Sequence, residues 1–241
     1  MRLPVPSFAC PASERNRVQV PSVLPQFERM NSSTQSRTNR FLDDSEKLVS
    51  SDLAALPGPT ALLLNVGLPS NKPLLQQPDL DRYAFLLSER LKQFSGQQFA
   101  SVWCTKRHAE ISTISVGLAA PTQPSNFGQT TTLITRRSYG NEQFKSEISD
   151  AIADLAPIED GPVALHISYV TGLPRTWANL WRPTIEGLGG LLGMRNPSKP
   201  WDVDAGRIAQ LALHHRSVGP SLGHSVQITV TAGPVSLNTI Q

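Results

Sequence analysis

The sequence predicts an α/β (α+β) protein with two similar units in tandem, preceded by an N-terminal tail. Short runs of β-branched and other apolar residues alternate with segments in which apolar residues recur at helical spacing. The order of these elements starts again after residue 129, and four short motifs occur in the same order in both halves. Each unit is therefore expected to contain a helix, a strand, a second helix and a strand pair.

Composition limits the classes of protein to which the chain can belong. Of the 241 residues, 39% are hydrophobic and 17% are charged, and 20 prolines and 16 glycines indicate substantial segments outside a core. No apolar run reaches the roughly 18 residues that a membrane span needs, so no membrane partner is expected. The net charge of +3 is compatible with nucleic acid without requiring it. Cys10 and Cys104 form no disulfide or zinc pattern, which favours a reducing, cytoplasmic environment.

Residues 1–38 are expected to form a disordered tail. They are rich in Pro, Ser, Gln and Arg and lack hydrophobic periodicity, so they cannot bury enough apolar surface to order themselves. The residues before Met30 have no pattern of a folding segment. Translation is therefore expected to start either at Met1 or at Met30.

The first unit is expected to occupy residues 39–118. An apolar stripe predicts a helix that begins at Phe41 and that Pro57 ends. Asp79 is suited to cap the second helix of the unit. The expected elements are a helix over 41–56, a strand over 60–66, a helix over 79–94, and a strand pair over 100–104 and 111–118 joined by a polar turn.

A Pro/Ser/Asn/Gly-rich linker over residues 119–129 leads to the second unit, residues 130–234. Pro183 lies inside a helical pattern, and it either opens a helix at its first turn or kinks a longer one. The expected elements are a strand over 130–135, a helix over 141–155, a strand over 163–170, a helix ending at 192, and a strand pair over 207–215 and 224–232.

Matching motifs indicate that the two units arose by tandem duplication. Residues 50–69, SSDLAALPGPTALLLNVGLP, and residues 151–174, AIADLAPIEDGPVALHISYVTGLP, share Asp-Leu-Ala, Gly-Pro, Ala-Leu and Gly-Leu-Pro in that order. The two Gly-Pro pairs are about one hundred residues apart, the length of an ordinary domain. The duplication predicts that strand 60–66 superposes on strand 163–170.

The segment 176–188 carries the most specific motif of the chain, TWANLWRPTIEGL. It resembles the signature of RusA-type Holliday-junction resolvases, Asp-x-Asp-Asn-Leu-x-Lys-Pro-x-x-Asp-x-Leu. Arg182 stands for the lysine and Glu186 for the last aspartate. Four positions match the signature: Asn179, Leu180, Pro183 and Leu188. Because these resolvases act as homodimers, the resemblance implies that the two units form an internal pseudo-dimer.

Most acidic positions of that signature are replaced. The resemblance implies Mg²⁺ binding by two aspartates of the motif and by one of a later Asp-Asp pair, but Thr176, Ala178 and Ala205 stand at those positions. Neither an alanine methyl nor a neutral hydroxyl replaces a carboxylate as a ligand of Mg²⁺. Asp204 stands at the first place of the later pair and is a candidate catalytic residue. The alternative is that Asp202 and Asp204 are turn and capping residues.

The first unit keeps an acidic pair at the corresponding helix start. Asp79 and Asp81 lie in or just before the first turn, where the helix dipole partly stabilises a carboxylate. They are therefore candidate catalytic residues and candidate Mg²⁺ ligands. The competing interpretation is that they cap the helix, because no Lys-Pro follows them and residues 95–104 contain no acidic side chain.

Basic and aromatic residues suggest a nucleic-acid interface. Arginine and lysine would contact phosphates, and a tryptophan would stack on an exposed base. The alternative is that the tryptophans are core residues surrounded by solvated charges. The candidate residues are Lys106, Arg107, Arg136, Arg137, Arg175, Trp177, Asn179 and Arg182.

The sequence therefore predicts a nucleic-acid-binding protein, selective for the structure of branched or duplex DNA, with weak or no nuclease activity. A non-catalytic protein-interaction module on the same fold is the alternative. A magnesium-dependent endodeoxyribonuclease that uses Asp79 and Asp81 is the third hypothesis. No cofactor other than Mg²⁺ is expected, and function has to be argued from the site because one fold supports many functions.

Overall fold

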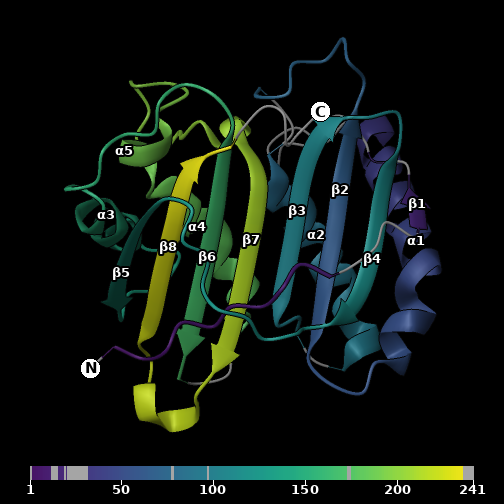
Figure 1. Ribbon diagram of the computed structural model, residues 1–241, viewed down its shortest axis with the longest axis horizontal. Helices are drawn as coiled ribbons and strands as arrows, with labels where there is room; N and C mark the ends of the chain where they lie inside the picture. The colour runs from purple at the N-terminus through teal and green to yellow at the C-terminus, as the bar shows by residue number, and fades with distance from the viewer. Residues whose placement is uncertain are drawn as a thin grey trace.

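Eight strands from both halves of the chain form one mixed sheet (Figure 1). The computed structural model describes residues 2–11, 16–18, 20, 32–76, 79–96, 98–172 and 175–235. The strand order across the sheet is β1-β4-β2-β3-β7-β6-β8-β5. Among the helices of these described residues, none combines the length and the apolar character that a membrane crossing needs. The fold belongs to the mixed α+β class that the sequence predicts.

The elements follow the order predicted from the sequence, and β1 is an additional strand that was not predicted. The strands are β1 (Asn16–Val18), β2 (Thr60–Leu68), β3 (Ser101–His108), β4 (Ser112–Leu118), β5 (Gln129–Thr135), β6 (Val163–Thr171), β7 (Ile208–Ser217) and β8 (Val226–Pro234). The α-helices are α1 (Ser32–Ala55), α2 (Leu80–Ser95), α3 (Glu142–Ala151), α4 (Trp181–Glu186) and α5 (Gly189–Leu192). The 3₁₀ turns are η1 (Trp177–Leu180), η2 (Ala205–Arg207) and η3 (Gly219–Leu222).

The two halves of the sheet have the same strand order and the same senses of pairing. β2 pairs in parallel with β3 and antiparallel with β4, and β6 pairs in parallel with β7 and antiparallel with β8. β1 extends the sheet beyond β4, and β5 extends it beyond β8, both antiparallel. β3 and β7 join the halves through an antiparallel ladder in which Trp103 lies opposite Ala212.

The prediction that the last two strands of each unit pair with each other is wrong. β3 and β4 flank β2 instead of pairing with each other, and β7 and β8 likewise flank β6. β3 also continues to His108, through residues expected to form a turn. Closeness in sequence favoured a hairpin. The central position instead goes to β2 and β6, whose nearly continuous apolar runs suit a strand that is covered on both faces.

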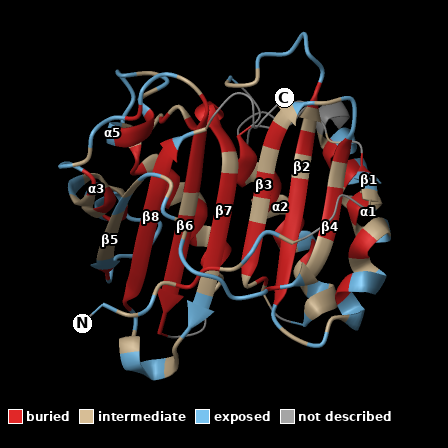
Figure 2. Cartoon of the chain, viewed as in Figure 1, coloured by how far each residue is buried: buried red, intermediate tan, exposed pale blue. Residues whose placement is uncertain are grey.

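The helices cover one face of the sheet and enclose the main core with it. Alternate residues of β2 and β6, such as Leu62, Leu64, Leu165 and Ile167, point into this layer and are fully buried. Figure 2 shows the central strands as almost entirely buried, whereas the outer surface of α1 is exposed. The helix layer therefore contains most of the apolar contacts that stabilise the fold.

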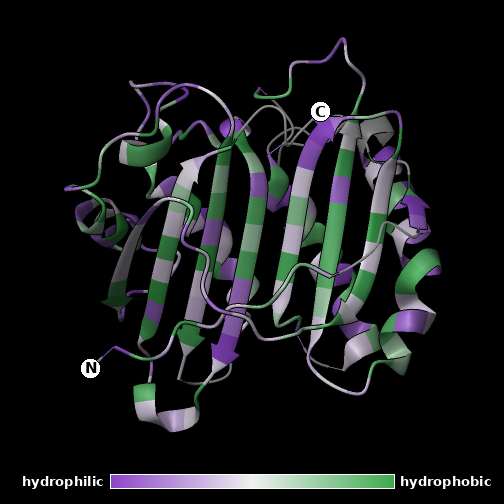
Figure 3. Cartoon of the chain, viewed as in Figure 1, coloured by the Kyte–Doolittle hydropathy of each residue, from purple (hydrophilic) through white to green (hydrophobic). Residues whose placement is uncertain are grey.

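Residues 2–11 and the linker 119–128 cross the opposite face of the sheet (Figure 1). Polar and apolar positions alternate along the strands (Figure 3), so this face offers hydrogen-bonding side chains. Ser168 Oγ donates to the Pro6 carbonyl at 2.7 Å, and the Leu3 amide donates to Gln227 Oε1 at 2.7 Å.

The prediction that residues 1–38 form a disordered tail is wrong for the described parts of this range. Residues 2–11 lie on the sheet, β1 pairs with β4, and α1 begins at Ser32, before the expected unit boundary at 39. These contacts are made to distant segments, so local composition gave no sign of them. Met30 and the other remaining residues of that range lie outside the described residues.

The helix expected to end at residue 192 is divided into η1, α4 and α5. Pro183 lies in the first turn of α4, where proline is tolerated because that amide needs no partner within the helix. This is the first of the two alternatives that the sequence left open. At Gly187, a Cβ would lie 2.8 Å from the Cβ of Ile148, so glycine permits α4 to end close against α3.

Candidate functional site

The acidic pair predicted from the sequence is buried at the start of α2. Asp79 and Asp81 have relative exposures of 2% and 3%. Asp79 occupies the N-cap position, but its side chain makes no capping hydrogen bond. The carboxylates are therefore engaged elsewhere, and simple capping does not account for them.

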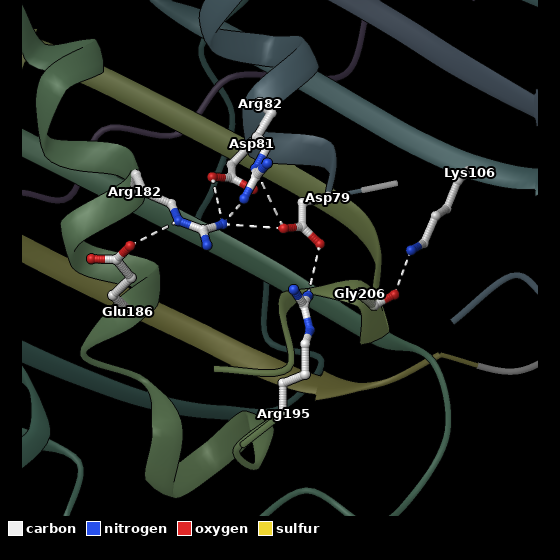
Figure 4. Close-up of polar contacts among 8 residues, drawn as sticks. All are labelled: Asp79, Asp81, Arg82, Lys106, Arg182, Glu186, Arg195 and Gly206. Carbon is white, nitrogen blue, oxygen red and sulfur yellow. Dashed lines mark hydrogen bonds and ion pairs between the residues drawn. The ribbon is translucent and has the colours of Figure 1, made fainter. Parts of the chain in front are cut away.

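Three arginines surround the acidic pair (Figure 4). Arg182 Nη1 lies 3.3 Å from Asp79 Oδ2 and 3.3 Å from Asp81 Oδ2. Arg195 Nη2 lies 3.1 Å from Asp79 Oδ1, and Arg82 Nε lies 3.5 Å from Asp79 Oδ2. Two of these arginines come from the second half of the chain, so the network joins the halves through charge.

Glu186 extends this network along α4. Arg182 Nε donates to Glu186 Oε1 at 2.9 Å, and Lys145 Nζ lies 2.6 Å from Glu186 Oε2. Burial acts to lower the pKa of Arg182, but Asp81, Asp79 and Glu186 together outweigh it and raise that pKa above its ordinary value. Arg182 is thus a permanently charged link between three carboxylates.

The two carboxylates of the pair differ in their ion-pair partners. Burial raises the pKa of Asp81, Arg182 opposes the shift, and Asp79 adds to it. Within the described residues, Arg182 is the ion-pair partner of Asp81, whereas Asp79 has contacts with three arginines. Asp81 therefore depends most strongly on Arg182.

This arrangement does not fit the Mg²⁺ site that the RusA resemblance implies. The guanidinium groups already neutralise Asp79 and Asp81, and they would repel a divalent cation placed between them. Among the described residues, no three His, Cys, Asp or Glu side chains are grouped so as to hold a metal ion. The predicted Mg²⁺ ligands are brought together, but as partners of arginine.

The side chain of Lys106 is not accessible to an external ligand. Its side chain is fully buried, and Nζ donates to the carbonyl of Gly206 (Figure 4). Burial lowers the pKa of Lys106 to about 8, while Asp79 and Asp204 oppose the shift. The expectation that Lys106 contacts a phosphate is wrong for this structure. Asp204, the third catalytic candidate, acts here as a charge near Lys106 at the start of η2.

Trp177 and Trp181 are core residues, each with a relative exposure of 1%. The Trp177 ring stacks on His215 with centroids 5.1 Å apart and planes 10° apart, and it meets Trp181 edge to face at 4.7 Å. The expectation that Trp177 stacks on a base is therefore wrong, because no face of its ring is accessible. The alternative that the tryptophans are core residues is confirmed for Trp177 and Trp181.

Four of the predicted nucleic-acid contacts come together in a different place. Arg136, Arg137, Arg175 and Asn179 line one cavity of about 480 Å³, which we call the arginine pocket. Its other lining residues are Ser138, Tyr139, Thr176 and His224. β5 and β6 are both antiparallel to β8, so the segments that follow them meet at the same edge of the sheet. Ligand sites commonly form beyond the carboxyl ends of such strands.

Side-chain contacts position the three arginines without neutralising most of their charge. Arg136 Nε donates to Ser225 Oγ at 3.2 Å, and Arg175 Nη2 donates to the His224 carbonyl at 3.0 Å. Arg137 Nε pairs with Glu147 at 2.9 Å, and this pair is largely exposed. In the described part of the chain, Glu147 is the carboxylate that pairs with these arginines, so the arginine pocket keeps a net positive charge.

Two other predicted contacts lie apart from the arginine pocket. Arg182 has its guanidinium directed at Asp79 and Asp81, as described above. Arg107 lies near the carboxyl end of β3, and β3 runs opposite to β7 and therefore to β6. Arg107 is thus at the other edge of the sheet from Arg175, and the structure does not bring the two together.

A larger cavity adjoins the arginine pocket and is mainly apolar. It has a volume of about 620 Å³ and lies between α1, α2 and α4; we call it the apolar cavity. Tyr139 and Asn179 line both cavities, and Asn179 Nδ2 donates to the Tyr139 hydroxyl at 3.4 Å. The apolar walls are Leu42, Phe85, Leu86, Trp181 and Pro183. In sequence these residues look like ordinary core positions of amphipathic helices, so no local signal marked the cavity.

Three histidines of the sheet are held neutral: His214 is buried, and His166 and His215 are half-buried. Burial lowers the pKa of His166 to about 4, of His214 to about 3, and of His215 to about 4. His166 and His214 face the side crossed by the N-terminal segment, where both meet the Trp103 ring edge to face at 5.1 Å and 5.5 Å.

Comparison with models of known protein families gives no match, and no curated protein is similar enough to count as a relative. The function therefore has to be inferred from the two cavities and the ion-pair network.

Proposed function

We propose that the protein binds nucleic acid through the arginine pocket. The observation that carries this proposal is the convergence of Arg136, Arg137 and Arg175, from two separate segments, on one cavity. The guanidinium fork matches a phosphate group in geometry and charge. Tyr139, with 45% of its surface exposed, offers an aromatic ring beside these arginines. Phosphate contacts of this kind supply most of the sequence-independent affinity for nucleic acid.

We also propose that the chain is a degenerate RusA-type resolvase in which two duplicated units form a pseudo-dimer. The matching order and pairing of β4-β2-β3 and β8-β6-β7 support this origin. So does the antiparallel junction of β3 and β7, since a two-fold axis between two like units would produce one. The shared sequence motifs of the two halves provide independent support.

The proposed function includes weak or no nuclease activity. A metal ion would offset the charge that develops on a phosphodiester during cleavage. The carboxylates that would hold it are paired with Arg182 and Arg195. We therefore assign Asp79 and Asp81 a structural role at the junction of the two halves. A protein-interaction module is the conclusion that would replace this proposal if no nucleic acid binds.

The proposal is tested by measuring the affinity for branched, duplex and single-stranded DNA over a range of salt concentrations. Each phosphate contact that is lost should flatten the slope of log affinity against log salt by about 0.9 on duplex DNA. The double variant Arg136→Ala/Arg137→Ala should therefore reduce the slope by about 1.8 and weaken binding to all sequences alike. Added Mg²⁺ should produce no cleavage above background.

Arg90 provides a matched control. It is exposed, it pairs with Asp43 and Glu46, and it lines neither cavity. Arg90→Ala changes the net charge in the same direction as each pocket variant but should leave the slope nearly unchanged. Equal slopes for the parent and Arg136→Ala/Arg137→Ala would remove the arginine pocket from the proposal. Absence of DNA binding by the parent at low salt would refute the proposal itself.

A further inference from the structure

We infer that the apolar cavity receives one unpaired base of the nucleic acid whose phosphate is held in the arginine pocket. This inference rests on the proposed function and specifies its substrate as single-stranded or locally unpaired DNA or RNA.

The two cavities are adjacent, as the phosphate and the base of one nucleotide are. Tyr139 and Asn179 form a shared wall, with the arginines on one side and the apolar walls on the other. A ligand that reaches around this wall would place its anionic part and its apolar part in different cavities. The apolar cavity, about 620 Å³, is within the size range of sites that enclose small organic groups.

The charges of the two cavities suit the two parts of a nucleotide. The acidic and basic side chains that line the apolar cavity are two carboxylates and two guanidinium groups: Asp81, Glu186, Arg82 and Arg182. Arg182 pairs with both of these carboxylates, so the cavity is electrically balanced and suits a neutral aromatic ring (Figure 4). The arginine pocket carries net positive charge and suits a phosphate.

The lining can also interact with the ring and the edge of a base. Phe85 and Tyr139 offer aromatic rings, and unstacked bases commonly stack on such side chains. Gln35 and Asn39 on α1 line the same cavity and are linked by a hydrogen bond of 3.0 Å. Amide groups donate and accept, as do the edges of bases. A base paired within a duplex cannot reach a cavity of this kind, so the occupant has to be unpaired.

The test compares a short single-stranded oligonucleotide with a fully abasic oligonucleotide of the same length and charge. Because stacking of one base contributes at least about fivefold to affinity, the abasic strand should bind the parent at least about fivefold more weakly. Both strands carry the same phosphates, so their salt slopes should agree. This comparison changes the ligand alone and does not depend on whether a variant folds.

A variant that fills the apolar cavity provides the second test. Leu86→Trp places an indole among the apolar walls and should abolish the preference for the strand with bases while leaving the salt slope unchanged. Ile111→Trp is the matched control because Ile111 is 40% exposed and lines neither cavity. It should behave like the parent.

The outcomes separate this inference from the proposed function. Equal binding of the two strands by the parent, with a slope that still falls in Arg136→Ala/Arg137→Ala, would overturn the base site and leave the proposed function standing. A free nucleoside monophosphate that bound as tightly as the oligonucleotide would overturn the assignment to a strand in favour of a mononucleotide ligand. Binding of neither strand would overturn both.

Discussion

Replacement of Arg182 by methionine tests whether the buried acidic pair is held by arginine. Methionine keeps much of the length and apolar surface of the side chain and removes the guanidinium. Asp79 would retain Arg195 at 3.1 Å, whereas Asp81 would lose its ion-pair partner at 3.3 Å. The variant therefore leaves one nearly uncompensated carboxylate at a position that is 3% exposed.

Breaking a buried ion pair on one side typically costs about 3–5 kcal/mol. The Arg182 side chain is 32% exposed, so water screens part of the interaction and we expect the lower end, about 3 kcal/mol of unfolding free energy at pH 7. For a chain of this size, that corresponds to a decrease in melting temperature of roughly 6–12 °C. Urea unfolding followed by circular dichroism measures the first quantity, and a thermal scan measures the second.

The pH dependence of this loss has a definite sign. The pKa of Asp81 is already raised from 3.8, so ionised Asp81 lowers the stability of the parent as the pH rises above that value. Without Arg182 the pKa should rise further. The cost of Arg182→Met should therefore be largest at neutral pH and should shrink as the pH falls and Asp81 takes up its proton, which its raised pKa lets it do above the ordinary range of a carboxyl group.

Two comparisons identify Asp81 as the cause. In an Asp81→Asn background, Arg182→Met should cost about 1–3 kcal/mol less, because no buried charge is left unpaired. Arg137→Met, which breaks an exposed pair with Glu147, should cost less than about 1 kcal/mol. The reasoning fails if Arg182→Met costs no more than Arg137→Met, or if its cost is the same with and without Asp81→Asn.

Two further predictions concern three histidines of the sheet and the two cysteines of the chain. The pKa values of His166, His214 and His215, about 3 to 4, lie below the ordinary 6.5. Stability should thus be complete above pH 6.5 and should fall as the pH drops toward 4, by up to about 1.4 kcal/mol per pH unit for each histidine; urea unfolding that gave a flat profile in this range would contradict it. Burial raises the pKa of Cys104, and Cys10 is exposed, so a thiol reagent should label Cys10 first in the native protein. Equal labelling rates before unfolding would show that Cys104 is accessible.

Local sequence information was sufficient for most elements of the fold. The strands predicted over 60–66 and 163–170 and the helix predicted over 79–94 are β2, β6 and α2, with ends displaced by only a few residues. Helical or alternating spacing of apolar residues determines these elements, and that spacing can be counted along the chain. The same information could not show which strands are neighbours, because pairing depends on segments that are far apart in sequence.

The same distinction between local and long-range information applies to the candidate site. Residue type alone drew attention to Asp79, Asp81, Arg136, Arg137 and Arg175, since carboxylates and guanidinium groups are the side chains that bind cations and phosphates. Their partners could not be inferred from type. An acidic pair has the same appearance in sequence whether a metal ion or an arginine lies opposite it.

By itself, the sequence determined the types of the elements, the α+β class and the positions of the charged residues along the chain. Each of these can be read from the residue itself or from its near neighbours in the chain. Only the tertiary structure decided the partners. Arg182 and Asp79 are separated by 103 positions and meet because the antiparallel junction of β3 and β7 brings the helices of the two halves together. Contacts between distant segments also bury Trp177 and direct Lys106 at the carbonyl of Gly206, and the pairing of β5 and β6 with β8 brings Arg136, Arg137 and Arg175 together. These outcomes follow from contacts between distant segments, and the spacing of residues along one segment carries no information about them.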